Sequence, residues 1–508
     1  MKISSSYLAV FLLNFLLTCE FWSLFVAMDD EAVTVLGAVR LLRGELPYRD
    51  WDTRHTPGSY FLSAACLGLT GPDSPFPRLL FSLISAFTAC LLWWLSRRYL
   101  ARSHWLVRGL PVFLWSTMGV SAFPILSYHW YGTLTVVAGC LALTRWLDRR
   151  RWAAELCGLS LALALWCLQS AALTLVLLTG LAWWRYRPPA APKMLATSLI
   201  ASLVLWLPLL PWTLLILQES LFNIGRHLSF NYQPYGLVYV RDLLAGLPDF
   251  GPQVKAWHVV ALRDDILVQV VQYLSIYPVA WLGVLVAEWR RRTGRAEPGE
   301  EIPAWGLLLW LLVTRAQQSP LYISFLAPIW LLTMAQLLAR WRLGQWAAGC
   351  LAGLEVVGWG LRAGLRREAF IYPIQTRAGL YYSNNQLQAA QLAVAAQWLQ
   401  EIPPGTPVLA YPFNTSFYTL FHLNNPIRPP VLQPLLYGEE DYAAALRDLK
   451  RERTGWLLIY RPTAPQHSSE FDRRTIPEWE RRIQQLTQDY EPAANYGNLT
   501  FYRLKVSR

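Results

Sequence analysis

Charged side chains are scarce in this sequence. Of its 508 residues, 15% are charged and 54% are hydrophobic, whereas a soluble domain usually carries about 25% charged residues. Apolar runs such as Leu8–Ala27 and Leu195–Leu217 approach the ~20 residues that are needed to cross the bilayer core. We therefore expect lipid to be the solvent around much of the chain.

Several signatures of cofactor-dependent or hydrolytic chemistry are also missing. The seven cysteines lie in or beside apolar stretches, with no CxxC and no Cys/His spacing typical of zinc. The sequence has no Walker A loop, no HExxH, no GxSxG elbow and no dinucleotide fingerprint. These absences argue against disulfides, a thiol-bound metal and a nucleotide site.

The net charge of +12 is concentrated in short arginine-rich loops between apolar runs. Such loops are retained in the cytoplasm and set the orientation of a membrane protein, so the charge does not indicate nucleic-acid binding. One charge, Lys2, precedes the first apolar run, and no small-residue cleavage site follows it. We interpret residues 7–27 as a retained membrane anchor.

Eleven membrane spans are predicted, and this odd count places every arginine-rich loop in the cytoplasm. Residues 28–76, 218–266 and 362–508 then fall outside, on the outer face of an inner membrane. The predicted spans are 7–27, 77–96, 106–124, 130–147, 152–168, 171–184, 194–217, 267–288, 303–316, 320–338 and 343–361.

The predicted fold is an α-helical polytopic membrane protein with a small extracytoplasmic α/β domain at its C-terminus. Residues 1–361 form the transmembrane domain, and residues 362–508 form the α/β domain. In the first outer loop, residues 31–43 and 58–69 are expected to form amphipathic or interfacial helices. The expected elements of the α/β domain are helices at 386–402, 441–451 and 477–488, and strands at 407–411, 456–460 and 499–504.

Three adjacent acids, Asp29, Asp30 and Glu31, follow the first apolar run directly. Carboxylates near lipid are costly unless they are solvated or used. One of them has the chemistry of a general base, with a neighbour tuning its pKa or holding a cation. Alternatively, the acids only cap the helix that follows, because negative charge suits a helix N-terminus. Both interpretations stay open at this point.

The same outer loop carries Tyr48, Arg49, Arg54 and His55. An arginine side chain can hold a phosphate in its planar fork, so these residues are candidate phosphate ligands. The alternative is that the cations neutralise the neighbouring acids Asp50 and Asp52.

Three further candidates lie elsewhere in the chain. Arg226 and His227 belong to the second long outer loop, and His129 stands beside Trp130 at the outer end of a predicted span. His129 either forms local hydrogen bonds or faces the site.

The order of these motifs resembles the GT-C superfamily of polyprenyl-phosphate-sugar-dependent glycosyltransferases, near the protein O-mannosyltransferase and lipid A aminoarabinose transferase branch. Asp30 and Glu31 follow the first span, the stretch at 42–50 is similar to the "leu-x-gly-x-x-pro-tyr" motif of that family, and a basic-proline element at 54–58 precedes an interfacial helix. The strand at 407–412 matches the segment after the last span. Two positions depart from the family pattern: Thr56 replaces a frequent lysine, and the His129 neighbourhood replaces a second acid.

The resemblance implies a GT-C fold and an inverting sugar transfer from a polyprenyl-phosphate-linked donor to an acceptor hydroxyl on a lipid, a protein or a polysaccharide. Asp30 would take the proton of the acceptor, and Glu31 would orient the base or the acceptor. Arg54, His55 and Arg226 would stabilise the departing phosphate. Whether a metal takes part stays open, and a divalent metal ion is the one candidate cofactor, because carboxylates have the chemistry to hold a hard divalent cation.

Two other functions compete with this interpretation. A transporter or flippase of lipid-linked sugars would need broken spans and paired charges at the midplane, whereas Glu20 and Glu355, which lie inside predicted spans, are isolated in the sequence. A non-catalytic scaffold would use its outer α/β domain to bind a partner and would tolerate Asp30→Asn.

Overall fold

The structure is a computed structural model. It describes residues 5–24, 28–53, 55–73, 75–120, 124–212, 266–314, 324–383, 386–412, 415–432, 438–461, 470–497 and 499–505. These residues form two compact units. The helical unit comprises Met1–Trp22, Arg54–Ser59 and Arg78–Ala369, and the mixed unit comprises Ser23–Thr53, Tyr60–Pro77 and Phe370–Arg508.

The helical unit is built from long apolar helices, and a helix is present at each of the eleven predicted spans. The helices are α1 (Ser5–Thr18), α4 (Phe76–Tyr99), α5 (Trp105–Leu114), α6 (Tyr128–Leu147), α7 (Ala153–Cys167), α8 (Gln169–Tyr186), α9 (Ala191–Trp206), α13 (Ile266–Arg292), α14 (Ile302–Val313), α16 (Ala327–Leu338) and α17 (Arg342–Ala369). Among the described residues, two helical stretches are long and apolar enough to cross a membrane, Phe76–Tyr99 and Ala191–Pro211. The number of spans and their orientation stay predictions.

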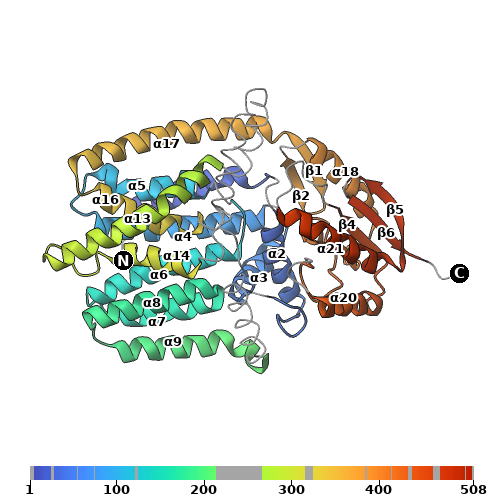
Figure 1. Cartoon of the computed structure of the whole chain (residues 1–508), viewed down its shortest axis with the longest axis horizontal. Coiled ribbons are helices and arrows are strands. Elements are labelled where there is room, and N and C mark those ends of the chain that lie inside the picture. The colour runs from blue at the N-terminus through green and yellow to red at the C-terminus, as the bar shows by residue number, and fades with distance from the viewer. Residues whose placement is uncertain are drawn as a thin grey trace. The chain divides into compact units, whose positions relative to one another are not determined.

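Helices α7, α8 and α9 run side by side in the helical unit (Figure 1). Glycine makes the closest approach possible, because a Cβ added at Gly158 would lie 2.3 Å from the carbonyl oxygen of Met194. The other face of α9 leaves Leu195, Leu199 and Val204 each more than 60% exposed. An apolar helix face that the protein itself does not cover suits a lipid environment.

Glu20 and Glu355, two of the acids inside predicted spans, are both paired with arginines of α17. Arg366 donates to Glu20 at 2.7 Å, and Arg362 donates to Glu355. Pairing is the usual condition for burying charge, so these carboxylates have a structural explanation.

The mixed unit contains the α/β fold that the sequence predicts. Its four-stranded sheet has the order β3-β4-β6-β5, in which β3 and β4 are parallel and the other pairs are antiparallel. A separate hairpin pairs β1 with β2. The elements are α2 (Met28–Leu42), α3 (Gly58–Thr70), β1 (Tyr372–Thr376), β2 (Gly379–Ser383), α18 (Gln386–Glu401), β3 (Val408–Tyr411), α19 (Ser416–Leu420), α20 (Glu439–Arg451), β4 (Trp456–Tyr460), α21 (Glu470–Thr487), β5 (Tyr490–Tyr496) and β6 (Leu499–Leu504).

Most of these elements were expected, including the two outer-loop helices α2 and α3. The sequence patterns miss the β1–β2 hairpin, the short α19 and β5, and they place the start of α21 at Pro477 instead of Glu470. Strand β5 lies at the sheet edge and carries Pro492 beside an irregularity in register. Proline is tolerated at such an edge but masks the strand signal in a sequence.

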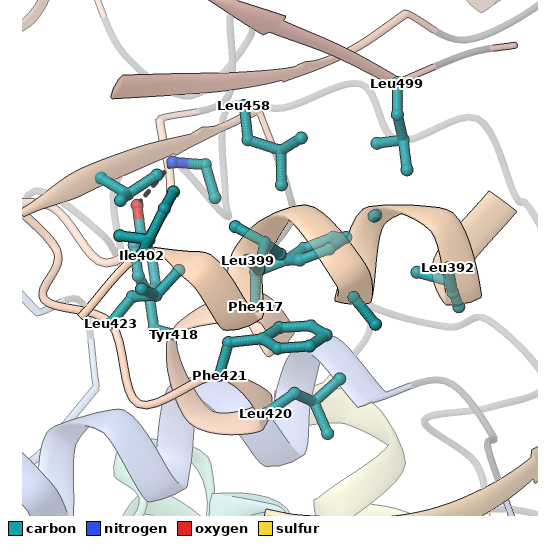
Figure 2. Packing of buried hydrophobic residues seen from close by; sticks show 14 of the residues in the cluster. Leu392, Leu399, Ile402, Phe417, Tyr418, Leu420, Phe421, Leu423, Leu458 and Leu499 are labelled. Atoms are coloured by element: carbon teal, nitrogen blue, oxygen red, sulfur yellow. Dashed lines mark hydrogen bonds between the residues drawn. The ribbon is translucent and has the colours of Figure 1, made fainter. Parts of the chain in front are cut away.

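The core on one side of the sheet joins α18 and α19 to β3, β4 and β6. Figure 2 shows Leu392 and Leu399 of α18 together with Phe417 and Phe421 near Leu458. The Tyr418 hydroxyl accepts a hydrogen bond from the Ala410 backbone N–H at 2.8 Å, drawn as a dashed line in Figure 2.

Helix α2 contributes to this same core. Leu36 is 3% exposed and belongs to the cluster, and α2 packs against α19. Helix α2, which carries the acidic triplet, is therefore packed against the C-terminal α/β fold.

Candidate active site

The acidic triplet forms the beginning of α2. Asp29, Asp30 and Glu31 follow Met28 in the first turn, and Glu31 is 4% exposed. Thr34 Oγ1 donates a hydrogen bond to the backbone carbonyl of Asp30 at 3.0 Å. Acids at this position interact favourably with the helix dipole, so the geometry agrees with the capping interpretation. It is also compatible with a general base at the same position.

Asp30 differs from an ordinary surface carboxylate in its affinity for a proton. Burial raises its pKa to about 6. With this pKa, the Asp30 carboxyl is deprotonated in roughly ten molecules out of eleven at pH 7. Its protonated form is an acid only slightly stronger than a solvent-exposed imidazolium. A carboxylate tuned in this way suits general-base chemistry near neutral pH.

The position of α2 is fixed by close packing and by a buried arginine. Arg40 donates to the carbonyls of Asn425 and Ile427 at 3.0 Å each and to that of Arg428 at 3.3 Å. A Cβ added at Gly37 would lie 2.4 Å from the Tyr60 ring. Because catalytic groups work best on rigid elements, this packing provides a firm base for the first turn.

Tyr48 and Arg49 lie in the turn that follows α2. Tyr48 adopts φ 67°, and its N–H donates to the Trp51 carbonyl at 2.8 Å. Arg49 pairs with Asp50 at 2.6 Å, and this hydrogen-bonded pair lowers the pKa of Asp50. The expected neutralisation is therefore seen at Asp50, while Asp52 is bound by Arg428 at 3.0 Å.

A pocket of about 560 Å³ opens in the mixed unit beside this turn. Five arginines line it with three acids: the lining residues are Leu36, Arg40, Arg43, Glu45, Arg49, Asp50, Pro407, Asn424, Asn425, Pro426, Ile427, Arg428, Arg451 and Glu452. Of these, the sequence patterns identified only Arg49 as a candidate ligand. The sequence did contain one indication that Arg40 faces the interior: it lies four residues after Leu36, on the apolar face of α2.

In the helical unit, the rings of His55 and His129, two predicted phosphate ligands, both contact the ring of Tyr128. His55 stacks on Tyr128 with ring centroids 3.8 Å apart, and the His129 ring lies 4.2 Å from that of Tyr128. On its other side, His129 stacks on Phe325 at 4.5 Å. Ser127 caps α6 by accepting a hydrogen bond from the His129 N–H, which fixes His129 in the first turn.

Four predicted site residues remain, and the structure describes only the backbone of one of them. For Asp29 the backbone is described, as part of α2, and Arg54, Arg226 and His227 lie outside the described residues. Within the described ranges, no group of three or more His, Cys, Asp or Glu side chains has the arrangement of a metal site.

These features define a class: a bundle of apolar helices joined in one chain to a mixed α/β unit, with adjacent acids in the first turn of α2. The fold has a counterpart among solved structures. It matches the crystal structure of ArnT from Cupriavidus metallidurans bound to undecaprenyl phosphate, with a TM-score of 0.53 over 98% of this chain and 97% of that chain. The two sequences are 12% identical, so the expected resemblance is confirmed for the fold. No protein-family model and no curated protein sequence matches the chain.

Proposed function

We propose that this protein is an inverting membrane glycosyltransferase of the GT-C type. It moves a sugar from a polyprenyl-phosphate donor to an acceptor hydroxyl on the outer face of the inner membrane, where residues 28–76, 218–266 and 362–508 lie. The fold match over 98% of the chain to ArnT, a protein crystallised with undecaprenyl phosphate, supports the use of a lipid-phosphate donor. The sugar is a hexose or a pentose.

Asp30 is the general base in this proposal. Its carboxylate takes the proton from the acceptor hydroxyl, whose oxygen attacks the anomeric carbon. The bond between that carbon and the phosphate oxygen breaks, and the polyprenyl phosphate leaves with the electron pair. A pKa of about 6 makes Asp30 a better proton acceptor than an ordinary aspartate while keeping it ionised at pH 7. Asp29 and Glu31 orient the base or the acceptor.

The departing phosphate requires positive charge or hydrogen-bond donors, which dominate the stabilisation of such transition states. We assign this role to His55, which stacks on Tyr128, and to His129, which stacks on Phe325. Arg54, Arg226 and His227 are assigned the same role on sequence grounds. Arg49 lines the arginine-rich pocket of the mixed unit, and Tyr48 precedes it in the same turn. In this proposal the pocket holds an anionic part of a substrate.

The position of Asp30 in the first turn of the packed helix α2, where burial raises its pKa, is the observation that carries the catalytic proposal. The test is transfer by purified Asp30→Asn in liposomes that contain a polyprenyl-phosphate sugar and an acceptor extract, followed by mass spectrometry. We expect a loss of at least ~100-fold, since the base provides a factor of this size. Glu491→Gln is the control, because it removes a half-exposed acid of the same unit that pairs with Arg503.

Two outcomes would refute the proposal. Transfer by Asp30→Asn at the wild-type rate would remove Asp30 as the base. Movement of the lipid-linked sugar across the liposome membrane by the wild-type protein, without consumption of the donor, would instead identify a flippase.

A further inference from the structure

A second pocket lies in the helical unit, where α4 and α6 end. It has a volume of about 510 Å³ and is lined by Trp94, Arg98, Arg145, Asp148 and Arg150. The two helix ends are joined by a hydrogen bond of 2.6 Å between the hydroxyls of Tyr99 and Thr144. The pocket is therefore bounded by elements that are held together.

The pocket keeps positive charge that no acid compensates. Its one acid, Asp148, accepts two hydrogen bonds from Arg98 at 2.9 and 3.2 Å, and Arg98 also pairs with Glu297 at 2.7 Å. Arg145 lies over the Trp94 ring at 5.8 Å. In the described part of the chain, neither Arg145 nor Arg150 forms an ion pair. Two guanidinium groups are therefore available to an anion.

Helix α4 indicates the level in the membrane at which the pocket lies. This helix is one of the two stretches that are long and apolar enough to cross a membrane, and Trp94 lies in its last turns, just before the basic residues Arg97 and Arg98. Tryptophan and arginine at the end of a span mark the level of the lipid headgroups, and basic loops mark the cytoplasmic side. The pocket opens at that level.

We propose that this pocket binds the phosphate of an anionic phospholipid from the cytoplasmic leaflet. Basic pockets between membrane helices on this side are suited to anionic headgroups. Arg145 and Arg150 hold the phosphate oxygens, and Trp94 positions Arg145 and borders the acyl-chain region. The inference rests on the membrane placement of α4 and not on the glycosyltransferase reaction.

Adjacent arginines of one loop provide a matched test. Arg150 lines the pocket, whereas Arg151, also exposed, lies over Trp152 at 5.1 Å and is not among the lining residues. The intact protein in neutral detergent is titrated with phosphatidylglycerol, and bound lipid is counted by native mass spectrometry. Phosphatidylcholine and soluble glycerol phosphate serve as competitors.

We expect Arg150→Gln to weaken the tightest phosphatidylglycerol site about 5-fold and Arg145→Gln/Arg150→Gln to weaken it about 30-fold, at about 1 kcal/mol per arginine. Arg151→Gln should bind like the wild type, and phosphatidylcholine should not compete. Because Arg150 is exposed and unpaired, Arg150→Gln should keep the wild-type melting temperature, so that its result reports on binding.

Three results would overturn the inference. Equal loss in Arg150→Gln and Arg151→Gln would mean a diffuse surface attraction. Displacement of the lipid by glycerol phosphate at equal concentration would mean a site for a soluble anion. Unchanged binding in the double variant would mean that the pocket takes no headgroup. The assay contains no sugar donor, so failure here is separate from failure of the proposed reaction.

Discussion

Arg40 Nη2 donates a hydrogen bond of 3.0 Å to the main-chain carbonyl of Ile427. This contact joins two segments of the mixed unit that are 387 residues apart in the sequence. Arg40 is 6% exposed and lies on α2, the helix whose first turn holds Asp30. The α/β fold therefore fixes the helix that carries the proposed base.

Removal of the Arg40 side chain should destabilise the mixed unit. Arg40→Ala would leave the carbonyls of Asn425 and Ile427 without their donor, while the Arg428 carbonyl would keep the Asp52 N–H. We expect a loss of about 3 kcal/mol in the free energy of unfolding. Urea unfolding in detergent, followed by tryptophan fluorescence, measures the change. Arg43→Ala, one residue beyond the end of α2, is the control, since the Arg43 side chain is exposed and bonds only to Asn424 among the described residues. Equal losses in both variants would contradict the role given to Arg40.

Transfer activity should depend on the ionisation of Asp30. The base works as the carboxylate, and its pKa is about 6. The logarithm of kcat/KM should therefore rise with a slope of about 1 up to pH ~6 and then level off. Initial rates between pH 4.5 and 8 test this profile. A plateau that extends down to pH 4.5 would show that the essential base has an ordinary aspartate pKa.

The same raised pKa predicts an effect of opposite sign on stability. A carboxyl whose pKa is higher in the folded than in the unfolded state binds its proton more tightly when folded, so its contribution is favourable at low pH and is lost as pH rises through about 6. Asp30→Asn should thus be more stable than the wild type at pH 7, by roughly 1–3 kcal/mol. Below pH ~4 the difference should vanish. Melting temperatures at both pH values measure it, and a lower melting temperature of the variant at pH 7 would contradict the desolvation of Asp30.

Neutralising one exposed arginine of the 560 Å³ pocket should weaken substrate binding more than turnover. We expect Arg43→Gln to raise the KM for an anionic substrate roughly fivefold to tenfold, with kcat within twofold, because one charge-assisted hydrogen bond is lost. Arg447→Gln is the control, as Arg447 is an exposed arginine of α20 that does not line the pocket. An unchanged KM in Arg43→Gln would separate this pocket from the substrate.

The helices were predictable from the sequence because their signal is local. Apolar runs bounded by arginines placed a helix at every predicted span, and the strands Val408–Tyr411 and Trp456–Tyr460 stand out by their β-branched and aromatic residues. In contrast, the hairpin at 372–383 alternates in burial over only five residues per strand. That signal is too short to separate from a loop.

The sequence indicated those parts of the candidate site whose residues are adjacent in the chain. It did not indicate the parts that are formed by distant segments. Asp30 and Glu31 were evident because acids directly after an apolar run are unusual. The pairing of Arg428 with Asp52 and the donation of Arg40 to residues 425–428 depend on long-range contacts, which no local pattern encodes. The same holds for the stacking of His55 on Tyr128 and of His129 on Phe325.

Stacking and chemistry at His55 are separable by substitution. His55→Phe keeps an aromatic ring that can stack on Tyr128, now at 3.8 Å between centroids, but removes both ring nitrogens. If the imidazole stabilises the departing phosphate, transfer should fall roughly 100-fold while the melting temperature stays close to that of the wild type. His55→Ala should lose activity to the same extent and also lower the melting temperature, because the stacking energy of about 1 kcal/mol is lost. Transfer assays with a polyprenyl-phosphate sugar, paired with thermal unfolding of each variant, measure both quantities. Wild-type transfer by His55→Phe would show that the ring at this position serves packing alone and that the phosphate is stabilised by other residues.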